Sequence, residues 1–156
     1  MRIDPTVLEE LKAFPGKVAA LAKTVRPTWH RTRLRGEGFA LVEHAWHLAD
    51  LEREGFGARI TRLAAEDRPS LPDFDGQRAA RERRYLDAEL DLGLKLFASA
   101  RAFNLHALEA LPDEAASRPG EQEGVGAVTL GDLPGKMLAH DRSHAAELAE
   151  LLDALR

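Results

Sequence analysis

The stretch LGDLPGKMLAHDRSHAAELAELLDAL, residues 130–155, decides both the fold and the candidate site. Apolar residues recur along it at steps of three or four, and this spacing predicts one helix with a stripe that faces the core. The stripe consists of Leu133, Met137, His140, His144, Leu148, Leu151 and Leu155. Two histidines therefore occupy the middle of a buried face, where the pattern favours leucine or isoleucine.

His140 and His144 are four residues apart, so their side chains lie one above the other on a helix. Two imidazoles in that arrangement can bind one divalent metal ion. The same spacing also fits two core histidines, each hydrogen-bonded to a carbonyl or a carboxylate. The pair alone leaves both interpretations open, and the rest of the chain has to favour one of them.

The composition predicts a single globular domain that spans residues 1–156. Hydrophobic residues make up 44% of the chain and charged residues 31%, which is typical of folded soluble domains. The formal net charge is -4 and no run of lysine or arginine stands out, so we expect no nucleic-acid partner. The sequence contains no signal-peptide core and no apolar run that could span a bilayer, so we expect a cytoplasmic protein with no membrane partner.

The absence of cysteine restricts the chemistry that this chain can perform. Disulfides, thiolate metal ligands and cysteine nucleophiles are all excluded. Any metal ion must therefore be bound by histidine, aspartate or glutamate.

Helical spacing recurs in three earlier segments, over about 4–26, 37–65 and 77–111. Together with the last helix they predict an all-α protein, a four-helix bundle whose long second connection permits a crossover. We expect a kink or a break at Pro15-Gly16 in the first segment, because proline removes a helix hydrogen bond. We also expect Gly55 and Gly57 to weaken the middle of the second segment.

The connections read as loops, because no sustained alternation of apolar and polar residues predicts a strand. Residues 27–37 form a loop that carries Trp29 and His30, and residues 68–73 form a linker with two prolines. Residues 117–131 are rich in glycine and predict the longest irregular stretch. Thr129 and Asp132 resemble a capping box at the start of the last helix. Residues 81–84 predict a solvated face with local ion pairs.

Two histidines on one helix form only half of a metal site, and a bundle completes such a site from facing helices. The candidates for a third ligand are His44 and His47 in the second helix, His106 in the third, and His30. His44 and His47 adjoin the core stripe of the second helix, which favours them. For His106 and His30 we expect partners in solvent or a backbone carbonyl.

Four carboxylates lie near these histidines in the sequence, namely Glu43, Asp50, Asp141 and Glu147. They could accept hydrogen bonds from ligand imidazoles and fix the tautomer of each ring. Surface carboxylates on solvated helix faces fit the same positions, so both interpretations stay open.

Two motifs resemble those of the DinB-like family. The stretch EHAWHLADLE, residues 43–52, is similar to its second-helix signature, in which a histidine precedes a Leu-x-Asp-x-Glu-type run. The stretch VTLGDL, residues 128–133, followed by His140-Asp141-x-x-His144, is similar to its fourth-helix signature. The order of the motifs, their separation and the chain length agree with the family as well.

The resemblance implies a four-helix bundle with a long crossover connection, often a homodimer, that binds one divalent ion through three histidines. Carried over by position, the ligands are His47, His140 and His144. His47 is preferred to His44 because it directly precedes the Leu-Ala-Asp run, and His44 is expected to be a hydrogen-bonded flank residue. The family implies nickel or zinc, and the ligand type also admits iron or manganese.

Three neutral imidazoles leave a coordination position open for water or for a donor atom of a small-molecule substrate. The resemblance then implies either a metal-dependent hydrolase or a transferase that delivers the thiolate of a low-molecular-weight thiol to an electrophile. A third hypothesis is a stress-associated bundle that binds a metal or a ligand without turnover. The sequence does not separate these hypotheses, and it assigns no catalytic residue.

Overall fold

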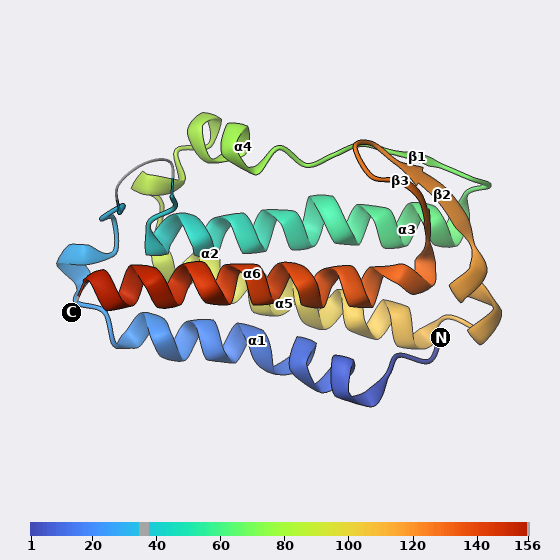
Figure 1. Cartoon of the computed structure of the whole chain (residues 1–156), viewed down its shortest axis with the longest axis horizontal. Helices are drawn as coiled ribbons and strands as arrows, with labels where there is room; N and C mark the ends of the chain where they lie inside the picture. The colour runs from blue at the N-terminus through green and yellow to red at the C-terminus, as the bar shows by residue number, and fades with distance from the viewer. Residues whose placement is uncertain (35–37, 156) are drawn as a thin grey trace.

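Four long helical rods run side by side in the computed structural model, which describes residues 1–34 and 38–155 (Figure 1). The first rod is α1 (Pro5–Lys23), and the second joins α2 (Leu41–Asp50), η2 (Leu51–Gly57) and α3 (Ala58–Ala65). The third rod is α5 (Leu90–Ala110) and the fourth is α6 (Leu133–Ala154). The four-helix bundle predicted from the helical spacing is therefore confirmed.

The second and third rods point in the same direction, opposite to α1 and α6 (Figure 1). The chain must therefore return along the bundle between α3 and α5, which is the predicted crossover. This connection contains β1 (Ser70–Leu71), α4 (Gly76–Glu82) and η3 (Tyr85–Asp87), and it runs alongside α2 and α3 (Figure 1).

The single helix predicted over residues 77–111 is wrong, because the chain leaves the helical conformation between α4 and α5. Arg84 has a φ of 53°, in the left-handed region that a helix cannot continue through. Two contacts with α2 stabilise the break: the Tyr85 hydroxyl donates to Asp50, and Trp46 Nε1 donates to the Glu89 carbonyl at 2.9 Å. Tertiary contacts have thus overridden a local helical pattern.

The solvated face predicted for residues 81–84 is confirmed, since all four are exposed, but their ion pairs are only partly local. Arg84 pairs with Asp87 at 2.7 Å, within its own segment. Arg83 instead reaches the second rod, where it donates to Asp50 Oδ2 at 2.6 Å and to Glu54 Oε2 at 2.8 Å. It therefore ties the crossover to the bundle.

A small three-stranded sheet lies where α3 ends and α6 begins (Figure 1). β1 pairs in parallel with β2 (Pro119–Gln122), which pairs antiparallel with β3 (Gly126–Thr129). Gly124 and Gly126 have positive φ angles of 75° and 100°, which allow the hairpin turn. The irregular structure predicted for residues 68–73 and 117–131 is wrong in these strands, because two- and four-residue strands are too short for a clear alternating pattern.

α1 begins as predicted and continues through the proline in its middle. Asp4 Oδ1 accepts the backbone N–H groups of Thr6 at 2.9 Å and Val7 at 3.1 Å, so it caps the helix. Pro15 lies inside the helix, which is therefore not broken there. Figure 1 shows the first turns of α1 tilted away from the rest of the helix, as expected for a kink.

The second rod begins at Leu41, whereas the predicted start near Glu37 lies outside the described residues. Its middle, η2, is a π-helix, at the place where Gly55 and Gly57 predicted a weak helix. The wider turn of a π-helix leaves a carbonyl without its usual partner. Asn104 of α5 supplies one, since its amide donates to the Glu52 carbonyl at 2.7 Å.

The predicted capping pair starts a 3-10 turn, η5 (Leu130–Asp132), that leads into α6, since Asp132 Oδ2 accepts the Thr129 N–H at 2.7 Å. Its inward stripe crosses two apolar clusters of the core. Met137 belongs to one cluster and Leu148 to the other, so His140 and His144 lie between two apolar clusters of the core. No helix of the described residues is both long and apolar enough to cross a membrane.

Candidate metal centre

The bundle brings His47 of α2 together with His140 and His144 of α6. One nitrogen of each residue lies within 4.8 Å of the others. The ring centroids are 4.4 Å apart for His140 and His144, 4.8 Å for His47 and His144, and 5.5 Å for His47 and His140. The three side chains that the motifs predicted as ligands thus form one group, and their role as ligands stays a prediction.

The spacing of two ring nitrogens fits a shared ion. His47 Nε2 and His140 Nε2 are 3.4 Å apart, which is long for a hydrogen bond. Two nitrogens bound to one tetrahedral ion at about 2.0–2.1 Å lie roughly 3.3–3.4 Å from each other. Histidines alone supply the donors of this group, as expected from a chain without cysteine.

Burial keeps all the histidines of the region neutral at neutral pH. Desolvation is the main cause that lowers the pKa of His44 and His47 to about 4, that of His140 to about 3 and that of His144 to about 2. Neighbouring histidines lower the pKa of His44, His140 and His144 further. Neutral imidazole is the form that binds a metal ion, so the group is in its metal-binding state at pH 7.

His44 lies behind His144 and is only 1% exposed. Its Nδ1 is 2.9 Å from His144 Nδ1, and the two rings are nearly perpendicular at 84°. His44, His144 and Glu147 form a second group of possible ligands, since Glu147 Oε2 is 3.9 Å from His44 Nε2 and 3.8 Å from His144 Nδ1. The geometry agrees with the expectation of a hydrogen-bonded residue beside the predicted ligands.

Three of the four carboxylates predicted beside the imidazoles form ion pairs with arginines instead. The pairs are Glu43 with Arg33, Asp50 with Arg83, and Asp141 with Arg101. These three carboxylates are buried, so the alternative of a surface position is wrong for them as well. Glu147 is exposed, and of the four it is the one placed against the histidine rings.

Arg101 is a buried residue that the sequence reasoning missed, although it interrupts the apolar stripe of α5 between Phe97 and Leu108. Its side chain is 2% exposed, and it donates to both oxygens of Asp141 at 2.7 and 2.8 Å. It also donates to Glu52 Oε2 at 3.0 Å. The two carboxylates raise the pKa of Arg101 against the opposing effect of burial. A charged network thus supports the residue that lies between the two histidines of α6.

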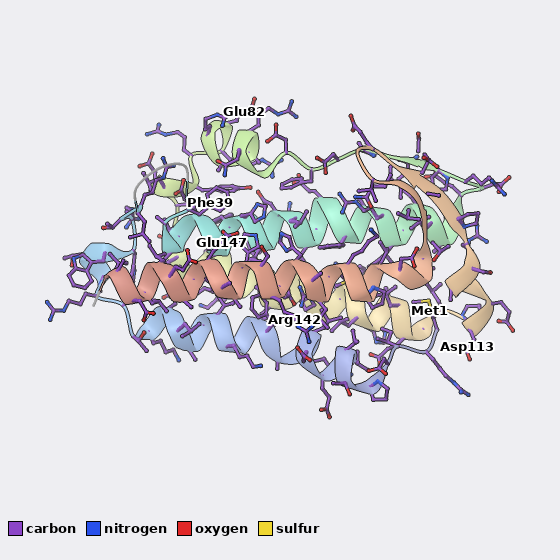
Figure 2. The ribbon with its side chains drawn as sticks, viewed as in Figure 1. Met1, Phe39, Glu82, Asp113, Arg142 and Glu147 are labelled. Carbon is purple, nitrogen blue, oxygen red and sulfur yellow. The ribbon has the colours of Figure 1, made fainter. Side chains whose placement is uncertain are left out.

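A cleft of about 440 Å³ leads to the histidine group, and it is lined by Gly38, Phe39, His47, Gly76, Gln77, His144 and Glu147. Phe39 and Glu147 mark it in Figure 2, near the start of α2. Aromatic rings surround the histidines: Phe39 is 5.2 Å from His47 and Phe74 is 6.2 Å from it, between ring centroids. The cleft therefore combines a mostly polar lining with one aromatic side chain, that of Phe39.

Gly76 of the crossover lies directly against His47, a contact that the sequence did not predict. A Cβ atom at Gly76 would be 2.5 Å from His47 Cε1 and 2.6 Å from its Nδ1. His47 Nδ1 is buried and has no hydrogen-bond partner. The backbone of the crossover therefore sets the space available to the ring of His47.

The remaining histidines and tryptophans lie away from the cleft. His30 Nε2 is 3.1 Å from the Val25 carbonyl and His106 is exposed, as expected for both. Trp29 packs against the apolar cluster near the end of α6 rather than lining the cleft. A larger groove of about 680 Å³ lies over α3 and α5 and contains none of the clustered histidines.

Among solved structures, the chain resembles YfiT from Bacillus subtilis, described as "a probable metal-dependent hydrolase with an unusual four-helix bundle topology". The two share 19% sequence identity with a TM-score of 0.85, and the match covers 96% of this chain and 88% of that chain. A likeness at this identity shows a common fold. A comparison with curated proteins found no match.

The sequence itself identifies the family. A family model described as the DinB superfamily matches residues 10–148, which include both histidine motifs. Since the match extends over most of the sequence and the fold agrees with it, this chain belongs to the DinB superfamily.

Proposed function

We propose that this protein is a metal-dependent hydrolase that binds one divalent ion through His47, His140 and His144. The observation that carries the proposal is the position of Glu147. It is the one carboxylate among the described residues that line the cleft, and it shares that lining with His47 and His144. A neutral histidine group and a carboxylate thus share one opening, as a metal-assisted hydrolysis requires.

The donor set supports the metal ion. Three neutral imidazoles suit a divalent ion such as nickel or zinc, and they leave a coordination position open. When bound, the ion would supply a Lewis acid for a water molecule or for the carbonyl oxygen of a substrate. YfiT, which has the same fold, is described as a probable metal-dependent hydrolase, which supports the same interpretation.

The chain's own residues would then perform two tasks. Glu147 would accept the proton of the attacking water and return it to the leaving group, as a general base and acid. Burial raises the pKa of Glu147 above the ordinary value of a glutamate. A carboxylate with a raised pKa is a stronger base. Phe39, which lines the cleft, would bind the apolar part of a small substrate and exclude water from it.

The volume of the cleft, about 440 Å³, suits a small molecule with an ester, amide or similar bond. We further propose, from the family resemblance, a cytoplasmic homodimer with a role in stress response. A thiol-dependent transferase or a non-catalytic binding bundle would use the same metal ligands. Turnover therefore has to be tested together with metal binding.

The first test is elemental analysis of protein purified without a histidine tag. We expect about one divalent ion per chain, and we expect His140→Ala to lose it because that substitution removes one of three ligands. A chain that carries no stoichiometric metal and binds neither nickel nor zinc would contradict the proposal.

The second test is hydrolysis of a panel of small esters and amides by the metal-loaded protein. We expect Glu147→Gln to keep the metal and to lower kcat by about 10²–10⁴-fold, the usual contribution of a general base. Glu150→Gln is the matched control, since Glu150 is also exposed on α6 but does not line the cleft. Turnover that depends on an added thiol would favour the transferase, and no turnover at all would favour the binding bundle.

A further inference from the structure

His144 contacts a second buried histidine, His44. His144 Nδ1 lies 2.9 Å from His44 Nδ1, so one of the two nitrogens donates a hydrogen bond to the other. His44 is 1% exposed, and α2 fixes it one turn before His47. The contact therefore joins the two rods that supply the predicted ligands.

The proton positions follow from the chemistry of the two rings. A neutral histidine has one N–H and one lone pair. If His144 donates from Nδ1, its Nε2 keeps the lone pair that a metal ion needs. His44 then accepts at Nδ1 and carries its own proton on Nε2, which faces the carboxylate of Glu147 at 3.9 Å. Every group in this arrangement meets a partner of the opposite polarity.

We propose that His44 is a positioning residue, which fixes the tautomer and the ring orientation of His144 so that its Nε2 is presented to the metal ion. This inference rests on the metal site proposed above. Histidine ligands almost always donate their second N–H to a fixed acceptor, and loss of that acceptor typically costs 10–100-fold in metal affinity. His44 supplies such an acceptor to His144.

The geometry separates this role from that of a fourth ligand. The Nδ1 of His44 is occupied by His144, and its Nε2 faces Glu147 rather than His47 and His140. His44 also belongs to a different group of possible ligands from the one formed by His47 and His140. A hydrogen bond to His144 therefore describes its contacts better than a bond to an ion shared with His140.

The test compares three substitutions at His44 by competition titration with Zn²⁺ and by the absorption spectrum of the Co²⁺-loaded protein. Asparagine places an amide oxygen close to the position of the histidine Nδ1, whereas glutamine and leucine do not. We expect His44→Leu and His44→Gln to weaken Zn²⁺ binding 10–100-fold and to alter the Co²⁺ spectrum. We expect His44→Asn to restore the wild-type affinity to within about threefold and to restore the spectrum.

Leu63→Ala is the folding control, because Leu63 is buried in the same rod beside Gly120 of the small sheet. It should lower thermal stability and leave Zn²⁺ affinity unchanged. Wild-type affinity in His44→Leu, or equal losses in His44→Asn and His44→Leu, would overturn the inference. So would a loss of all binding in His44→Leu with full binding in His47→Ala, which would place the ion between His44, His144 and Glu147. If the wild-type chain binds no metal, the proposed site fails first and independently.

Discussion

The two sides of one turn of α6 are built in opposite ways. On the side that faces α2, His140 and His144 meet His47 as neutral rings whose ring nitrogens approach one another. On the other side, Asp141 meets Arg101 in a bidentate ion pair at 2.7 and 2.8 Å. His47, His144 and Asp141 are buried and His140 is partly buried, and His140 and Asp141 are consecutive in the sequence.

The two sides differ in whether a partner for their polar groups lies within the chain. The carboxylates of Asp141 and Glu52 find a cation within the chain, since Arg101 reaches both of them. The Nε2 atoms of His47 and His140 face each other at 3.4 Å, and a divalent ion is a partner that suits two neutral imidazoles. We call the Arg101 network the charged side and the group of His47, His140 and His144 the neutral side. We infer that the charged side stabilises the bundle by itself, whereas the neutral side gains stability from a bound ligand.

The largest expected effect comes from breaking the charged side. Arg101→Leu would leave Asp141 and Glu52 buried without their cation, at 2–3% side-chain exposure. We expect a loss of about 3–5 kcal/mol in the free energy of unfolding, measured by urea denaturation of the metal-free protein. The cause is the cost of an unpaired charge in a dry environment.

Arg142→Leu is the matched control for Arg101→Leu. Arg142 also lies beside Asp141 on α6 and pairs with a carboxylate, Glu10, but its side chain is 64% exposed. We expect its loss to cost less than about 1 kcal/mol. Similar losses for the two substitutions would show that the buried network does not stabilise the bundle.

The second prediction concerns the neutral side and its response to acid. The four histidines have folded-state pKa values of about 4 or lower, below the ordinary value of 6.5. The unfolded chain therefore takes up protons first as the pH falls. Their contribution to stability is fully present above pH 6.5. It is lost as the pH falls to about 4 for His44 and His47, and the loss continues to lower pH for His140 and His144.

We expect the free energy of unfolding of the metal-free protein to fall between pH 6.5 and 4.5. The slope should correspond to the uptake of more than one proton on unfolding. Each proton corresponds to about 1.4 kcal/mol per pH unit. Urea denaturation at several pH values in the presence of a chelator measures the slope. His44→Asn should reduce it by up to one proton, and a flat profile over this range would contradict the prediction.

The neutral side was largely predictable from the sequence, and the charged side was not. A histidine on an apolar helical stripe is visible in a local pattern, and the spacing of His140 and His144 predicts that they share a face. Arg101 interrupts a stripe in the same way, but its partners Asp141 and Glu52 are 40 and 49 residues away in the chain. Pairing over such separations depends on how the rods pack, which periodicity does not encode.

The crossover shows a second reason why local patterns fail. Its helical spacing predicted one helix over 77–111, but the contacts of Tyr85 with Asp50 and of Trp46 with Glu89 stabilise a break. The same crossover brings Gly76 against His47, and this neighbour decides how much room a predicted ligand has. Aspartate followed by glycine at 75–76 indicates a turn, but it does not indicate what the turn contacts.

The smallest expected effect would come from a substitution that disturbs the contact of Gly76 with His47. In Gly76→Ala the new Cβ would lie 2.5 Å from His47 Cε1, so the ring would have to move and carry its Nε2 away from His140. We expect Zn²⁺ affinity to fall about tenfold, which is about 1.4 kcal/mol, measured by competition titration.

Gly38→Ala is the control for Gly76→Ala, because Gly38 lines the same cleft and a Cβ there would meet nothing within 4 Å. It should leave Zn²⁺ affinity unchanged. If Gly76→Ala binds Zn²⁺ as tightly as Gly38→Ala does, the position of the His47 ring does not limit binding. The ion would then depend mainly on the pair from α6, and the neutral side would need no support from the crossover.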